Sequence, residues 1–269
     1  MTSGSESANY QDYLEQLSAL HAVVYERDKV SFIKDDRLFL YRPEREELGD
    51  VAGKSLLHLQ CRSGLETLSW AKLGAQTVGI DFDQTAIQRA KYLAQDFNAT
   101  FHRADIYKLP EILTETFDVV YTGYGVLCWL DDLPAWGKIV ARYLKPGGTF
   151  YLVDYHPSAN LLDEDLDLQN PEASYPRSCY PYQHVRYQHH SIKDALPPFE
   201  YRGMSVWAYT LGDVLNALSD AGLHITYVHE QEYMFARRFE QMEQDQQGYW
   251  RWRDPNYHAP QLFSVRATR

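Results

Sequence analysis

The sequence has 269 residues, of which 45% are hydrophobic and 23% are charged, as in ordinary globular proteins. This length is enough for one large α/β domain, or for a domain with a lid. The net charge is −11, from 26 basic and 37 acidic residues. It argues against nucleic acid as a main partner, because phosphate binding needs a basic surface.

The N-terminal segment, the apolar runs and the cysteines bear on the compartment. MTSGSESANYQDYLEQ is polar and acidic, unlike a secretory signal, and no apolar run approaches the ~18 residues of a membrane span. Cys61, Cys128 and Cys179 are too few and too scattered for a disulfide framework or a zinc site. We therefore expect a cytoplasmic protein with no metal site and no membrane partner.

Residues 9–45 are predicted to be partly helical, so that residues 1–45 form a cap over the edge of a sheet. From Lys54 onward, short apolar strands alternate with amphipathic helices. The predicted strands cover residues 55–59, 77–80, 100–103, 117–122 and 149–154, and the predicted helices between them cover residues 64–73, 84–97 and 133–144. Such alternation predicts a parallel sheet with right-handed crossovers, here a core over residues 46–155.

The alternation stops after Tyr155, and six prolines between residues 157 and 198 exclude long regular elements. We interpret residues 156–209 as an inserted lid that binds the second substrate. The core resumes over residues 210–269. A helix is predicted over residues 211–221, with strands over 224–229 and 261–268 and an irregular stretch between these strands.

Ligands of an open parallel sheet bind at the carboxyl ends of its strands. The first strand leads into HLQCRSG, where Gly64 allows a close backbone approach at a helix N-terminus. The second ends in Asp81, whose carboxylate suits the two hydroxyls of a ribose, and Phe82 either lies along an adenine or is simply buried. The third is followed by Asp105, which can accept from an adenine amino group, and by Ile106, which can pack on the ring.

The fourth strand ends in the small and aromatic loop YTGYGVLCW, where Tyr121 and Thr122 either face a cofactor or only pack. Aromatic residues of this loop, the cap and the lid either line a pocket for a small organic acceptor or only pack. The candidates are Tyr25, Tyr41, Tyr124, Trp129, Tyr180 and Trp207.

This series resembles a class I S-adenosylmethionine-dependent methyltransferase. The family's first motif, hydrophobic-D-L-G-C-G-T-G, is similar to LHLQCRSG, its ribose-binding acid to Asp81 in GIDFD, and its adenine-binding acid to Asp105 in ADIYKLP. FDVVYTGYGVLCWLDDLPAWGKIVARYLKPGGTFYLVD is similar to the family's FDVV…L.PGG…V region. The resemblance covers about residues 50–155 and extends to TLGDVLNALSDAGLHITYVHE and LFSVRAT. HLQC and DYHP further resemble a bacterial subgroup of these enzymes.

The resemblance implies a doubly wound, mostly parallel, seven-stranded Rossmann-like sheet that binds S-adenosylmethionine and releases S-adenosylhomocysteine. The cofactor-binding residues that it implies are Gln60, Cys61, Arg62, Gly64, Asp81, Phe82, Asp105, Ile106, Tyr121 and Thr122. The first motif departs from the family at His58, which replaces an Asp, and at Gln60 and Arg62, which replace glycines. Arg62 either pairs with the methionine carboxylate of the cofactor or projects to solvent.

The resulting functional prediction is in-line methyl transfer to an O, N, S or C nucleophile of a small molecule, by a monomer or homodimer. His156 is either a general base or a structural histidine held by Asp154. His184, His189 and His190 either bind a metal or lie in a solvated loop. The alternatives are a catalytically silent binding protein on the same fold and an NAD-dependent oxidoreductase, although the sequence lacks G-x-G-x-x-G.

Overall fold

The computed structural model describes residues 37–160, 185–187, 204–207 and 209–269. Some of the predictions lie outside the described residues. These are the predictions for residues 1–36, for most of the lid, and for Tyr25, Tyr180, His184, His189 and His190.

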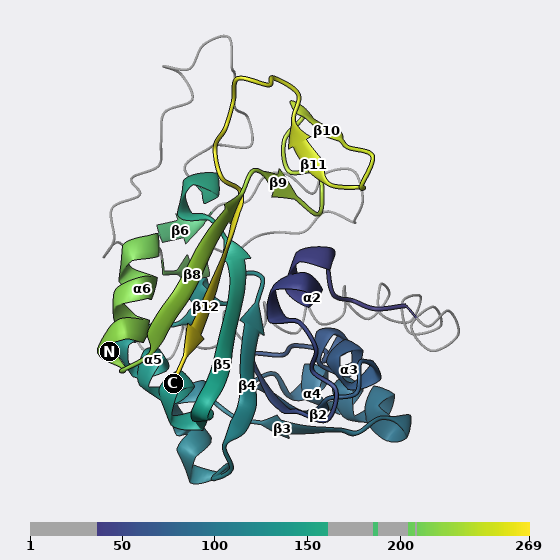
Figure 1. Ribbon diagram of the computed structural model, residues 1–269, viewed down its shortest axis with the longest axis vertical. Helices are drawn as coiled ribbons and strands as arrows, with labels where there is room; N and C mark the ends of the chain where they lie inside the picture. Colours follow the sequence, from purple (N-terminus) through teal and green to yellow (C-terminus); the bar gives the residue numbers. More distant parts are fainter. Residues whose placement is uncertain (1–36, 161–184, 188–203, 208) are drawn as a thin grey trace. The chain divides into compact units, whose positions relative to one another are not determined.

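Seven strands form one hydrogen-bonded sheet in the order β3-β2-β1-β4-β5-β12-β8 (Figure 1). Its strands are β1 (Ser55–Leu59), β2 (Gln76–Asp81), β3 (Ala99–Arg103), β4 (Phe117–Gly123), β5 (Leu144–Tyr155), β8 (His224–Gln231) and β12 (Leu262–Thr268). β1 pairs in parallel with β2 and β4, and β2 with β3, whereas β12 is antiparallel to β8. The predicted α/β fold with a mostly parallel seven-stranded sheet is confirmed.

The helices of the described residues follow the predicted order closely. They are α2 (Arg42–Leu48), α3 (Leu65–Lys72), α4 (Gln84–Leu93), α5 (Leu133–Tyr143) and α6 (Leu211–Asp220), with 3-10 turns η1 (Ala94–Asp96), η2 (Ile106–Glu111), η3 (Leu127–Trp129) and η4 (Pro157–Asn160). The side chain of Asp83 caps α4 by accepting from the N–H groups of Thr85 and Ala86, as a good N-cap residue does. Of the predicted N-terminal cap, the described part contains α2.

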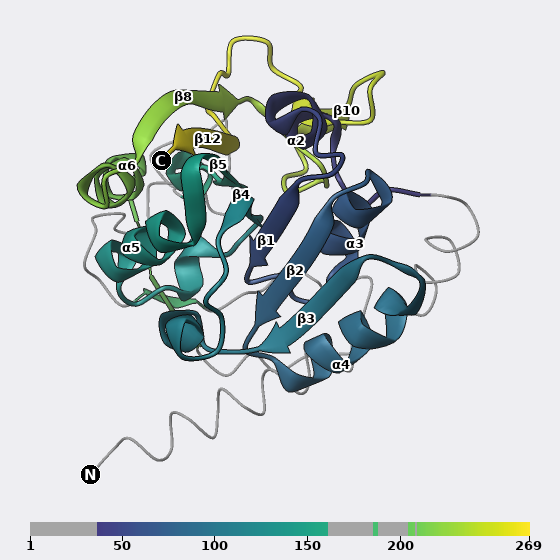
Figure 2. The ribbon, with the colours of Figure 1, turned by 60° about the horizontal axis from the view of Figure 1, so that its bottom comes forward.

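The chain divides into two compact units, each described here by itself. The first contains residues 1–122, 139–151 and 269, and the second contains residues 123–138 and 152–268. Within the first unit, β1, β2 and β3 lie side by side, and α4 runs along β3 (Figure 2).

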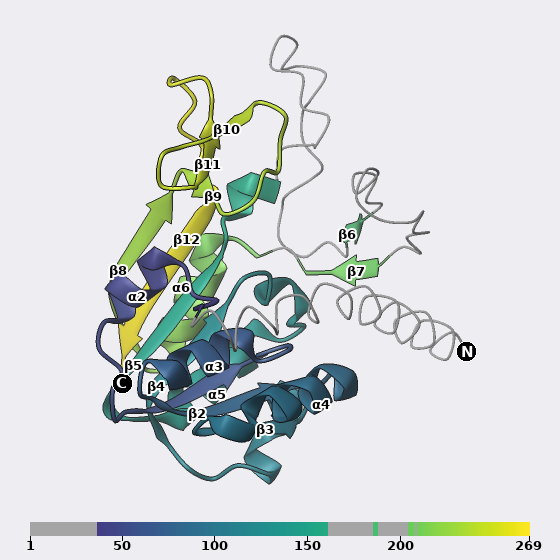
Figure 3. The same ribbon diagram turned by 90° about the vertical axis from the view of Figure 1, so that its right-hand side faces the viewer.

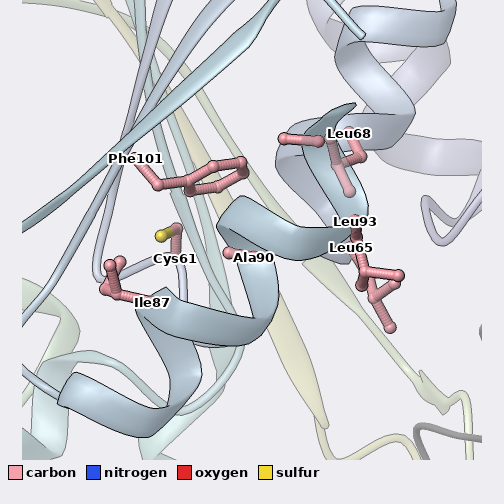
Figure 4. Close-up of a cluster of buried hydrophobic side chains, with 8 residues drawn as sticks. Cys61, Leu65, Leu68, Ile87, Ala90, Leu93 and Phe101 are labelled. Atoms are coloured by element: carbon pink, nitrogen blue, oxygen red, sulfur yellow. The ribbon is translucent and has the colours of Figure 1, made fainter. Parts of the chain in front are cut away.

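Phe101 is the central ring of a buried cluster in the first unit. Cys61 and residues of α3 and α4 form this cluster with it (Figure 4). A Cβ atom on Gly64 or on Gly79 would lie 2.5 Å from the Phe101 ring, which is closer than packed atoms approach. The close packing of this ring therefore requires glycine at both positions.

The α2 helix is bound to the first unit by two glutamates. The Glu44 carboxylate is fully buried and accepts hydrogen bonds from the Tyr121 hydroxyl and the Tyr41 backbone N–H. The Glu47 carboxylate accepts from the Tyr151 hydroxyl at 2.8 Å. The rings of Tyr121 and Tyr151 are stacked at 6.2 Å. Two of the many tyrosines thus serve to attach this helix.

Two segments differ from the predicted elements. A strand was predicted over residues 149–154, but β5 already begins at Leu144 and includes KPGG, where the Gly147 N–H donates to the Arg269 carbonyl. The stretch after β8 was predicted to be irregular, but it contains a three-stranded antiparallel sheet in the order β10-β11-β9. Its strands are β9 (Tyr233–Met234), β10 (Met242–Gln244) and β11 (Trp250–Trp252).

Within the lid, the described part includes one antiparallel pair, β6 (Val185–Tyr187) with β7 (Met204–Val206). In the second unit, α5 packs closely on α6. A Cβ atom on Gly137 would lie 2.3 Å from the Ala217 carbonyl oxygen. The close contact of the two helices therefore requires glycine at position 137.

Candidate functional site

The turn after β1 has an unusual backbone. Gln60 and Arg62 have φ angles of 57° and 48°, and Gly64 has a φ angle of 74°. This left-handed region is normally occupied by glycine, and a larger residue there costs about 1 kcal/mol. The chain therefore keeps left-handed backbone at the two positions where the resembled family has glycine, although neither residue is glycine.

Asp81 holds this turn from the end of β2. Its Oδ2 accepts from the backbone N–H of Arg62 at 2.7 Å, and its Oδ1 accepts from the N–H of Asp83 at 2.9 Å. The side chain is buried, and this burial raises the pKa of the carboxyl against the opposing effect of these hydrogen bonds. A carboxylate has about four acceptor positions, so the two remaining positions can accept from ligand hydroxyls.

Phe82 follows Asp81 and presents an exposed ring, with 38% of its surface accessible. A large apolar side chain at such a position gains by covering a ligand ring. On the next strand, Asp105 is exposed and accepts from the Tyr107 N–H at 2.9 Å, and Ile106 is partly buried. Each of these three residues is thus accessible to a ligand.

Three further predicted cofactor-binding residues of the first unit, Cys61, Tyr121 and Thr122, have buried side chains. The Cys61 side chain lies in the cluster around Phe101, and burial raises the pKa of its thiol. The Tyr121 ring is fully buried, and its hydroxyl donates to Glu44. The Thr122 hydroxyl donates to the Leu59 carbonyl at 3.1 Å. Any contact of Tyr121 and Thr122 with a cofactor must therefore use backbone atoms.

Two residues that depart from the family's first motif differ in charge: Arg62 is exposed and positively charged, whereas His58 is buried and neutral. The Arg62 side chain is exposed, and its positive charge opposes the rise that burial causes in the pKa values of Glu66 and Asp81. His58 is buried beside Thr67, with Nδ1 of the ring 2.8 Å from the Thr67 hydroxyl. Burial lowers the pKa of His58 to about 3, so the ring that replaces the family's Asp is neutral.

In the second unit, Asp154 organises the loop that follows β4. Its buried carboxylate accepts from the N–H groups of Gly125, Val126 and Leu127, and from its neighbour Tyr155. Burial raises the pKa of this carboxyl despite these hydrogen bonds. Its partners are therefore backbone groups, and the prediction that Asp154 holds His156 is wrong.

His156 is held instead by two side chains of the second unit. Its Nδ1 lies 2.6 Å from the Ser158 hydroxyl, and its Nε2 lies 2.7 Å from Glu230 Oε1. The Ser158 hydroxyl in turn donates to the Pro260 carbonyl. Because both ring nitrogens have partners, His156 can act as a base only after one of these contacts opens, so the prediction of a catalytic role gains no support from this geometry.

The described candidates for the acceptor pocket are divided between the two units. Tyr41 is exposed at the start of α2 in the first unit. Tyr124, Trp129 and Trp207 belong to the second unit, where the Trp207 N–H donates to the Cys128 carbonyl. Among the described residues there is no group of three or more His, Cys, Asp or Glu that could hold a metal ion.

One aromatic group escaped the prediction from sequence. Tyr233, Phe235 and Tyr249 contact one another in the connection between β8 and β12. The aromatic-rich runs YMF and YWRW in that connection were the available indication, but their spacing fits no long helix or strand.

Comparison with known proteins identifies the domain. Residues 57–152 match the model of a methyltransferase domain family. The chain is 30% identical over 149 residues to the ubiquinone biosynthesis O-methyltransferase of Rhodopseudomonas palustris, covering 53% of this chain and 55% of that protein. It is 36% identical over 118 residues to an uncharacterized methyltransferase of Synechocystis, covering 44% of this chain and 54% of that protein. The chain thus spans about half the length of the curated relatives it matches.

Solved structures agree on the fold. An S-adenosylmethionine-dependent methyltransferase from Mesorhizobium loti aligns with a TM-score of 0.58 at 22% identity, over 84% of this chain and 95% of that one. A second, from Listeria monocytogenes, aligns with a TM-score of 0.56 at 20% identity, over 84% of this chain and 97% of that one. Residues 57–152 thus match a methyltransferase domain, in agreement with the resemblance inferred from the motifs, and the two solved structures share its fold. Of the described helices, none has the length and apolar character to cross a membrane.

Proposed function

We propose that the protein transfers the methyl group of S-adenosylmethionine to a small-molecule acceptor. The observation that carries this proposal is the hydrogen bond between Asp81 and the Arg62 N–H, which joins the turn after β1 to the end of β2. It places a buried carboxylate with spare acceptor positions next to a turn whose backbone is left-handed at Gln60, Arg62 and Gly64.

The residues present fit the cofactor. Asp81 would accept from the ribose hydroxyls, and Phe82 and Ile106 would cover the adenine, whose amino group Asp105 would bind. The turn over residues 60–64 would hold the methionine portion through its backbone, and the exposed Arg62 guanidinium would pair with the carboxylate. When bound, the cofactor supplies a methyl group activated by a positively charged sulfur.

The protein's own contribution to the reaction would be alignment of the two reactants and exclusion of water. Asp154 would fix the loop after β4, which bears Tyr124, by binding three of its N–H groups. A nucleophile that must lose a proton would need a general base. His156 would serve only after its contact with Glu230 or Ser158 opens.

The two relatives named as O-methyltransferase and as methyltransferase support this proposal, and the first favours a hydroxyl acceptor. The rival of a silent binding protein rested on the lack of glycine at Gln60 and Arg62. Both residues keep positive φ angles, which supports the enzyme over the silent binding protein.

Calorimetry distinguishes the methyltransferase from the oxidoreductase. We expect the full chain to bind S-adenosylhomocysteine with one site, and not to bind NAD⁺. Binding of NAD⁺ in preference would favour the oxidoreductase. Failure to bind either ligand would contradict both enzyme proposals.

A further inference from the structure

The small sheet between β8 and β12 has two faces of different character. It lies beyond the carboxyl end of β8 and before β12 (Figures 1 and 3). Because side chains alternate along strands, the pairing of Met242 with Trp252 and of Trp250 with Met234 places these residues on one face. Met234, Met242 and Trp252 form its buried core with Phe239 and Leu262.

Tyr233 and Phe235 also pack against this core, and they belong to an aromatic layer at the other face. Tyr233 pairs with Arg251 there, and the Tyr233 ring stacks on Tyr249 with centroids 4.6 Å apart. Phe235 meets both rings edge-on, at 5.9 Å from Tyr233 and 5.8 Å from Tyr249. The Arg251 guanidinium lies 4.9 Å from the Tyr233 ring centroid and pairs with Asp245 at 2.7 Å. All three rings remain partly exposed.

Tyr124 connects this aromatic layer to the end of β4. Its ring meets Phe235 at 5.4 Å and nearly perpendicular. Its φ angle is 55°, and its N–H donates to the Val153 carbonyl, while Asp154 binds the N–H of the following Gly125. A non-glycine residue in this region costs about 1 kcal/mol and persists where neighbouring contacts fix it, which occurs most often at functional sites.

We propose that Tyr124, Tyr233, Phe235 and Tyr249 form the acceptor-binding wall of the enzyme, and that the acceptor is a planar aromatic molecule. This inference rests on the proposed methyl transfer. Tyr124 follows β4, at the sheet edge where ligands of parallel sheets bind. Several partly exposed rings in edge-on and stacked contact favour another flat ring, because such pairs prefer offset or perpendicular arrangements. The Arg251–Tyr233 contact adds a fixed positive charge at the rim of the wall.

The test compares a flat probe with its saturated counterpart. The full-length protein is saturated with S-adenosylhomocysteine and titrated calorimetrically with naphthalene-2,3-diol and with decahydronaphthalene-2,3-diol. We expect the aromatic diol to bind at least about tenfold more tightly, since ring pairs each contribute beyond area burial. Equal affinity for the two diols would overturn the inference.

Substitutions in the wall test whether its rings cause the preference for the aromatic diol. Phe235→Leu removes a ring but keeps an apolar side chain, and we expect it to reduce the preference about fivefold or more, while Phe235→Tyr restores it. Tyr92→Leu removes an exposed ring of α4 and should leave the preference unchanged. If Phe235→Leu leaves the preference intact while its thermal unfolding matches wild type, the wall is not where the acceptor binds.

Binding of S-adenosylhomocysteine is measured for every variant, so the two proposals can fail separately. A protein that binds S-adenosylhomocysteine but shows no preference for the aromatic diol contradicts the wall and leaves methyl transfer standing. A protein that does not bind S-adenosylhomocysteine contradicts both.

Discussion

The backbone N–H of Arg62 donates to Oδ2 of Asp81 at 2.7 Å, so the turn after β1 and the end of β2 are fixed by one hydrogen bond. The same carboxylate is the group that we expect to bind the ribose. Asp81 therefore has two tasks, and the shape of the glycine-poor turn depends on it. This explains how Arg62 can occupy a left-handed conformation that the family gives to glycine.

The strain at Arg62 can be measured directly. Arg62→Gly should be more stable than Arg62→Ala by about 1 kcal/mol, because glycine adopts a positive φ angle without steric cost and alanine does not. Urea unfolding of the two variants gives this difference. The control pair is Arg89→Gly and Arg89→Ala within α4, where alanine should be the more stable by a similar amount. If the alanine variant is the more stable one at position 62, as at position 89, the left-handed conformation of Arg62 is contradicted.

His58 should make the protein less stable in mild acid. Its pKa is lowered by burial to about 3, below the value near 6.5 of an unfolded chain. Between these values the unfolded state binds the extra proton, so stability decreases as pH falls from 6.5 toward 3. By this linkage the loss from pH 7 to pH 5 is about 2 kcal/mol.

The measurement for His58 is urea unfolding of wild type and His58→Asn at pH 7 and pH 5. The wild type should lose about 2 kcal/mol more than the variant over this interval. His102→Asn, which changes an exposed residue of β3, should behave like wild type. Equal pH dependence of wild type and His58→Asn would show that His58 is not held neutral.

Asp154→Asn should destabilise the second unit. An asparagine presents an N–H₂ group to the N–H donors of the loop after β4, so charge-assisted hydrogen bonds are replaced by a donor conflict. We expect a loss of about 2–4 kcal/mol in the free energy of unfolding. Asp220→Asn, at the exposed end of α6, should change it by less than about 0.5 kcal/mol. A neutral Asp154→Asn would mean that the loop needs no carboxylate.

Phe101 and Gly79 should be energetically coupled. A Cβ atom at Gly79 would lie 2.5 Å from the Phe101 ring and 2.9 Å from the Cys61 sulfur, so Gly79→Ala should cost about 1–3 kcal/mol. In the double variant Gly79→Ala/Phe101→Leu, the leucine at position 101 leaves room for the new methyl group at position 79. Its cost should be lower than the sum of the single costs by about 1 kcal/mol or more. Strict additivity in urea unfolding would contradict this packing.

The order of the core elements could be predicted from sequence, because apolar strands and amphipathic helices alternate with clear boundaries. β1 has the predicted bounds, α3 is one residue shorter than predicted at each end, and α6 is one residue shorter at its C-terminal end. The small sheet of β9, β10 and β11 could not be predicted, because strands of two or three residues show no periodicity. Its stability comes from long-range packing of Met234, Met242 and Trp252.

The sequence predicts which residues of the candidate site lie at the strand ends, but it does not predict where their side chains point. Asp81 is buried at the end of β2 and Phe82 after it is exposed, and their places in the chain follow from the predicted strand. Tyr121 was a candidate for facing the cofactor, but its ring is buried and its hydroxyl donates to Glu44. That contact joins residues 77 positions apart, and no local pattern predicts it. The positive φ angles of Gln60 and Tyr124 were likewise hidden, since neither residue type favours them.

The most direct test of the proposed function is a calorimetric titration of wild type and Asp81→Ala with S-adenosylhomocysteine. Asp83→Ala is the matched control, because it removes a neighbouring carboxylate that caps α4. The account predicts one site on wild type, an affinity at least about tenfold weaker for Asp81→Ala, and little change for Asp83→Ala. No binding to wild type, or equal affinity for wild type and Asp81→Ala, would contradict it.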